Sequence, residues 1–124
     1  MSKTVLVVDD DKLIRGEIVA LLEKAKHVVY EAPNGKEGLE LAKKFHPDIV
    51  LTDLRMPVMD GHQMVEEIRK DEEWGRHVPV LILTSDDSTA SLNSALQSGV
   101  TVYLTKNGLD PEALSDQLLM AVGD

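Results

Sequence analysis

Polar groups that could do chemistry follow four short apolar runs of this chain, and they are Asp9, Asp10, Asp53, Thr84 and Lys106. The runs are too short for solvent-facing helices and too apolar for loops. We therefore interpret them as strands buried on both faces, as in a parallel sheet. The carboxyl ends of such strands lie at one edge of the sheet, where open α/β sheets bind ligands. The five groups are expected to converge on one crevice.

The chemistry of this set is that of phosphoryl transfer. Carboxylates packed together repel one another unless a cation lies between them. Oxygen ligands without histidine or cysteine suit Mg²⁺, which Asp10 would hold with Asp9 nearby. The Asp53 carboxylate can attack a phosphoryl group and form an acyl phosphate. Lys106 and Thr84 can then contact the transferred oxygens.

Composition limits the class of protein. The chain has 124 residues, which suits one domain, and 43% of them are hydrophobic. Thirteen basic and 22 acidic residues give a net charge of −9, which argues against direct nucleic-acid binding. There is no cysteine, so disulfides and thiolate metal sites are excluded. The apolar run near the N-terminus is too short for a signal peptide or a membrane span, so we expect a cytoplasmic protein with no membrane partner.

The segments that position these groups alternate between strand and helix. Apolar runs predict strands at residues 5–8, 27–31, 49–51, 79–83 and 100–104. Helical spacing of apolar residues predicts helices at 12–25, 35–45, 64–73 and 88–98, and a last helix from 110. We expect Asp11 to cap the first helix, Leu13 to lie on its apolar stripe, and Trp74 to cover a helix end.

This order predicts an α/β fold. Five strand–helix units with short connections form a (βα)5 doubly wound parallel sheet with helices on both faces. No linker or repeat interrupts the pattern. The expectation is a single domain over residues 1–124, with a core of about 4–122 and no output domain.

Four segments resemble the receiver domain of two-component response regulators, of the chemotaxis-regulator type. They are Val-Leu-Val-Val-Asp-Asp-Asp at 5–11, Asp-Ile-Val-Leu-Thr-Asp-Leu-Arg-Met-Pro-Val-Met-Asp-Gly at 48–61, Val-Leu-Ile-Leu-Thr-Ser at 80–85 and Val-Tyr-Leu-Thr-Lys at 102–106. The resemblance runs from residue 5 to about 122. It implies a flavodoxin-like sheet with strand order 2-1-3-4-5.

The resemblance also assigns roles at the crevice. It implies that Asp53 accepts a phosphoryl group from a phosphohistidine on a histidine kinase or histidine phosphotransfer protein. The Mg²⁺ ligands would be Asp9, Asp10 and Asp53, together with the backbone carbonyl of Arg55. Lys106 would pair with Asp53 and then with the phosphoryl group. The protein would not be an enzyme beyond catalysing its own phosphorylation and dephosphorylation.

A switch pair is implied as well. Thr84 would move to a phosphoryl oxygen, and the ring of Tyr103 would turn inward to fill the vacated space. That change would remodel the face made by residues 88–98, 100–104 and the last helix, where a downstream protein would bind. A receiver of this kind is a monomer or a dimer formed on phosphorylation.

Alternatives stay open where the chain departs from the family. The residue after Lys106 is usually a proline, often preceded by a cis bond, and here it is Asn107. A cis bond without proline costs about 2.5–4 kcal/mol, so Lys106 either tolerates that strain or reaches in from a trans loop. The alternative function is a pseudo-receiver, a protein-docking module independent of phosphorylation. A phosphoester hydrolase is disfavoured because no cap domain is present, and flavin or dinucleotide binding because no glycine-rich loop follows the first strand.

Overall fold

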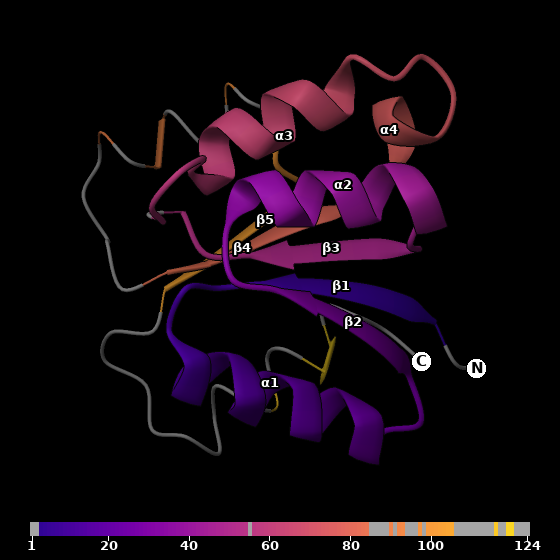
Figure 1. Cartoon of the computed structure of the whole chain (residues 1–124), viewed down its shortest axis with the longest axis vertical. Coiled ribbons are helices and arrows are strands. Elements are labelled where there is room, and N and C mark those ends of the chain that lie inside the picture. The colour runs from indigo at the N-terminus through magenta and orange to yellow at the C-terminus, as the bar shows by residue number, and fades with distance from the viewer. Residues whose placement is uncertain are drawn as a thin grey trace.

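One sheet of five parallel strands organises the structure, a computed structural model that describes residues 3–54, 56–84, 90, 92–93, 97, 99–105, 116 and 119–120. The strands are β1 (Thr4–Val8), β2 (Val28–Ala32), β3 (Ile49–Thr52), β4 (Val80–Thr84) and β5 (Val102–Thr105). Their order is β2-β1-β3-β4-β5, and each neighbouring pair is parallel, as predicted (Figure 1). The predicted helices at 88–98 and from 110 lie largely outside the described residues.

Helices cover both faces of the sheet. They are α1 (Lys12–Lys24), α2 (Gly35–Phe45), α3 (Gly61–Arg69) and the short α4 (Trp74–His77). Figure 1 shows α1 on one face of the sheet and α2 with α3 on the other. This arrangement confirms the predicted doubly wound α/β fold.

The core lies in two layers because alternate residues of a strand point to opposite faces. On the α1 face the buried residues are Val5, Val7, Ile18, Val19, Leu22, Ile49, Leu51, Leu81 and Leu83. On the α2 and α3 face they are Leu6, Val8, Ala32, Ala42, Val50, Met64, Val65, Ile68, Val78 and Val80. The uninterrupted apolar runs of the sequence therefore fill both layers, as expected for central parallel strands.

Side-chain caps set where the helices begin. Asp11 accepts hydrogen bonds from the backbone N–H groups of Leu13 and Ile14, which confirms it as the α1 cap. Asn34 accepts one from the N–H of Glu37 at the start of α2. Each bond satisfies a donor that the first turn of a helix leaves unpaired.

The single tryptophan of the chain, Trp74 at the start of α4, packs on the end of α2. His46 ends the helix with a left-handed backbone, and the Trp74 ring stacks on its imidazole at 4.8 Å between centroids. The indole N–H donates to the carbonyl of Pro47 over 2.9 Å. The expectation that Trp74 covers a helix end is therefore confirmed.

Two local expectations were wrong. The third helix ends at Arg69, and a separate short helix begins at Trp74. Asp71 explains the break, because its carboxylate accepts the N–H groups of Glu73 and Gly75 and so competes with helix hydrogen bonding. Leu13 is 73% exposed and does not join the core. No helix in the described part of the chain could cross a membrane.

Candidate functional site

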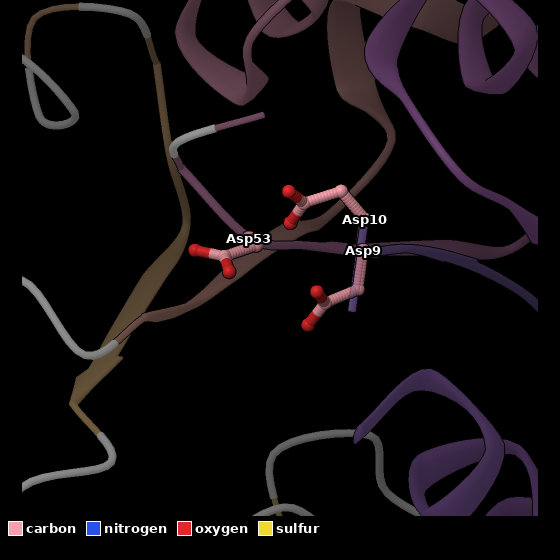
Figure 2. Close-up of side chains that lie close together, drawn as sticks. All are labelled: Asp9, Asp10 and Asp53. Atoms are coloured by element: carbon pink, nitrogen blue, oxygen red, sulfur yellow. The ribbon is translucent and has the colours of Figure 1, made fainter. Parts of the chain in front are cut away.

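Three carboxylates meet at the carboxyl edge of the sheet. Asp9 and Asp10 follow β1, and Asp53 follows the neighbouring strand β3. Each offers an oxygen that lies within 4.8 Å of the other two. Figure 2 shows Asp9 and Asp10 leaving the end of β1 on opposite sides, with the Asp53 side chain beside them. The predicted convergence of these three residues is thus seen in the structure.

Sheet register places them together. Val8, the last residue of β1, lies opposite Thr52, the last residue of β3. The ladder continues one step further, since the N–H of Asp53 donates to the carbonyl of Val8 over 2.9 Å. The two strands therefore deliver their acidic residues at the same height.

Hydrogen bonds within the turn after β1, and from the turn to β2 and α1, hold it in place. Asp9 is 2% exposed, and its Oδ1 accepts the N–H of Asp11 over 2.9 Å. Its N–H donates to the carbonyl of Ala32 in β2 over 3.1 Å. Arg15 of α1 donates from Nη1 to the backbone carbonyl of Asp9 over 2.7 Å. The buried Asp9 is thus tied to two neighbouring elements.

The backbone around Asp53 is fixed as tightly. Its Oδ1 accepts the N–H of Leu54 over 2.6 Å, and its carbonyl accepts the hydroxyl of Thr52 over 2.8 Å. The N–H of Gly61, at the start of α3, donates to the carbonyl of Leu54 over 2.8 Å. A Cβ at Gly61 would lie 2.2 Å from the Asp53 carbonyl oxygen, so only glycine allows this approach. The start of α3 therefore supports the loop that carries Asp53.

Thr84 and Tyr103 lie on one face of the sheet. Thr84 ends β4 and is 2% exposed. Tyr103 lies in β5 opposite Ile82, two residues before Thr84 on the neighbouring strand, so both point to the same side. The ring is partly buried and packs against the cluster of Leu54 and Ile82. Their action as a switch pair stays a prediction.

Two expected site residues, Lys106 and Arg55, lie outside the described residues, and so does the bond between Lys106 and Asn107. The contact of Arg15 with the Asp9 carbonyl was not predicted from the sequence. The second partner of Arg15, Glu31, belongs to the next strand. Only the position of β2 beside β1 brings that partner within reach.

The donor set fits a hard divalent cation. The cluster offers carboxylate oxygens only, from one buried, one exposed and one partly buried aspartate. Mg²⁺ prefers oxygen ligands and keeps several waters, so a partly open cluster of a few carboxylates suits it. A cation there would also relieve the repulsion among the three negative groups.

Comparison with known proteins agrees with this geometry. Residues 5–119 match the family described as response regulator receiver domain. The chain is 35% identical over 121 residues to the chemotaxis protein CheY of Halobacterium salinarum, covering 95% of this chain and 98% of that protein. It also resembles the structure of the chemotaxis response regulator CheY4 of Vibrio cholerae, with a TM-score of 0.85 and 31% identity over 98% of this chain and 99% of that one.

A further similar structure contains a metal. The receiver domain of the sensor histidine kinase PA1611 from Pseudomonas aeruginosa PAO1 has a magnesium ion coordinated in its active site cleft. It is 29% identical to this chain, with a TM-score of 0.83 and 100% of both chains covered. Because the family match spans most of the sequence and the sheet has the same order as expected, the chain belongs to the response regulator receiver domain family.

Proposed function

We propose that this receiver takes a phosphoryl group on Asp53 from a phosphohistidine of a histidine kinase or phosphotransfer protein. The observation that carries the proposal is the convergence of three carboxylate oxygens within 4.8 Å at the ends of β1 and β3. Aspartyl phosphorylation and dependence on Mg²⁺ are general in this family.

In the proposed reaction, an Asp53 oxygen attacks the phosphorus of the donor. A P–O bond forms as the P–N bond breaks, and the electron pair returns to the donor imidazole nitrogen, which takes up a proton. The bond from the Leu54 N–H to Oδ1 fixes the rotation of the carboxylate before the attack. Such preorganisation lowers the entropic cost of bringing the reacting atoms together.

The metal ligands in this proposal are Asp9, Asp10 and Asp53, with the Arg55 carbonyl as a further one. Bound there, Mg²⁺ would neutralise charge on the transferred oxygens. Lys106 would contact another phosphoryl oxygen. The protein would act on itself rather than turn over a separate substrate.

The output in this proposal is a change of binding surface. Thr84 would move toward the phosphoryl group, and Tyr103 would follow on the same face of the sheet. The placement of both side chains on that face supports the pairing. A downstream protein would recognise the altered surface around β5 and its flanking segments.

The test is intact-mass spectrometry after incubation with Mg²⁺ and a small acyl phosphate. Wild type is expected to gain one phosphoryl group, and Asp53→Asn or removal of Mg²⁺ is expected to abolish the gain. Asp60→Asn is a matched control, because asparagine caps a helix as well as aspartate does and α3 should still begin at the same place. No gain in wild type would favour the pseudo-receiver, and Asn107→Pro would then be the next variant.

A further inference from the structure

One cation lies beside the acidic cluster without pairing to it in the contacts of the described residues. The Arg15 side chain is only 13% exposed. Its Nη1 donates to the backbone carbonyl of Asp9 over 2.7 Å, and its Nε donates to Oε1 of Glu31 in β2 over 2.9 Å. A guanidinium usually prefers carboxylates or phosphates, so its contact with a peptide carbonyl needs an explanation.

The carbonyl that Arg15 holds belongs to the peptide joining Asp9 to Asp10. Within the described part of the chain, no hydrogen bond holds the exposed Asp10 carboxylate. The direction of that side chain therefore depends on the plane of the peptide before it. Arg15 fixes this plane from the α1 side, while the bond from the Asp9 N–H to Ala32 fixes the other side of the residue.

Glu31 has a separate effect on the same guanidinium. Its carboxylate occupies the Nε–H of Arg15 and so keeps the guanidinium aimed along the turn. Without that anchor, a tethered cation next to three carboxylates could pair with them and compete with a metal ion. The Glu31 carboxylate therefore keeps the guanidinium away from the metal ligands, and the ion pair as a whole carries no net charge.

We infer that Arg15, held by Glu31, is a positioning residue that sets the Asp9–Asp10 turn for divalent cation binding. The inference rests on the proposed function, because it assumes that this cluster binds Mg²⁺. Partners that orient metal ligands typically contribute 10–100-fold to metal affinity. We expect Arg15→Gln to weaken Mg²⁺ binding by about 10-fold.

The sign of the effect separates positioning from simple electrostatics. Removing a positive charge beside an acidic cluster makes the site more negative, so Coulomb attraction alone predicts tighter Mg²⁺ binding in Arg15→Gln. Positioning predicts weaker binding. In the double variant Arg15→Gln with Glu31→Gln the net charge is unchanged, so electrostatics predicts nearly wild-type affinity. Positioning predicts the same loss as in Arg15→Gln alone.

The experiment is titration calorimetry with Mg²⁺ on the full chain, with thermal unfolding measured in parallel. Arg76→Gln is the matched control, since Arg76 is exposed in α4, before the amino end of β4 and away from the carboxyl edge. Arg15→Lys keeps the charge but cannot form both bonds of the fork. It is expected to fall between wild type and Arg15→Gln.

Each result of the Mg²⁺ titration either supports or overturns the inference. Weaker Mg²⁺ binding in Arg15→Gln and in the double variant, with Arg76→Gln unchanged, supports the inference. Unchanged or tighter binding in Arg15→Gln, even with a lower melting temperature, overturns it. If that variant does not fold, wild-type affinity in Arg15→Lys overturns it instead. Absence of Mg²⁺ binding in wild type would overturn the metal part of the proposed function itself, and the inference with it.

Discussion

Alanine at three glycines should change stability by different amounts and in both directions, because the space around each glycine differs. A Cβ at Gly16, on the exposed face of α1, would have nothing within 4 Å. At Gly38, in α2, it would lie 2.8 Å from Val8 Cγ2 and 2.9 Å from Met64 Sδ. At Gly61 it would lie 2.2 Å from a backbone oxygen, that of Asp53.

The magnitudes follow from what each neighbour can do. Gly16→Ala should stabilise the fold by about 0.8–1 kcal/mol, the difference in helix propensity. At Gly38 the same gain is offset by overpacking of about 1–3 kcal/mol, since methionine can move but valine is stiff. At Gly61 the start of α3 must move by about 1 Å away from the Asp53 carbonyl oxygen, which strains the hydrogen bond from the Gly61 N–H to the Leu54 carbonyl. We expect a loss of about 2–4 kcal/mol there.

The assay is urea and thermal unfolding followed by far-UV circular dichroism. A change of 1 kcal/mol should move the midpoint temperature of a domain of this size by about 3–5 °C. Gly61→Ala is therefore expected to melt roughly 10 °C below wild type, and Gly16→Ala about 3 °C above it. The denaturant slopes should stay equal, so that the differences reflect stability rather than a change in the unfolded state.

The order of the three variants decides whether the reasoning is right. If Gly61→Ala is as stable as wild type, the close approach of α3 to the Asp53 backbone does not constrain the fold. If Gly16→Ala loses stability, its surroundings are not open. Equal effects at all three positions would mean that the helix propensity of alanine outweighs local packing throughout.

Three further changes test the helix ends. Asn34→Ala should cost about 1 kcal/mol in urea unfolding, because α2 loses its cap, and an unchanged midpoint would contradict that role. Trp74→Phe should cost about 0.5–1.5 kcal/mol by circular dichroism, because the bond to the Pro47 carbonyl is lost while a ring remains. The hydrogen bond from the N–H of Gly75 lowers the pKa of Asp71, and the bond from the N–H of Glu73 lowers it to a smaller extent. The stability that the ionised Asp71 carboxylate contributes is therefore present above the unfolded-state pKa of about 3.9, and it is lost as pH falls through the pKa of the folded state. Asp71→Asn should thus be less stable than wild type near neutral pH and should match it in acid, and a gap that persists in acid would refute this.

The strands and caps were predictable because their causes are local. A run such as residues 5–8 is apolar at every position, which only a strand buried on both faces requires. Asp11 and Asn34 precede helical spacing by one residue, and both cap their helices. The break after Arg69 was missed because the prediction of a helix over residues 64–73 rested on the spacing of apolar residues, which does not show how the Asp71 carboxylate bonds. That carboxylate accepts hydrogen bonds from the backbone N–H groups of Glu73 and Gly75, which follow it in the chain.

The acidic cluster could be predicted from the sequence, whereas the hydrogen bonds that hold the turn after β1 could not. Asp9, Asp10 and Asp53 could be brought together from the sequence, since any parallel sheet that pairs their strands brings the carboxyl ends to one edge. The two hydrogen bonds of Arg15, to Glu31 and to the Asp9 carbonyl, could not be predicted, because they depend on which strand lies beside β1 at the edge of the sheet. The apolar pattern does not order the strands, and the order 2-1-3-4-5 came from the family resemblance. Once β2 lies beside β1, Glu31 faces α1 and Ala32 receives the N–H of Asp9. The residues that form the cluster are thus set by the ends of their own strands, while the hydrogen bonds that hold the turn after β1 depend on the neighbouring strand β2.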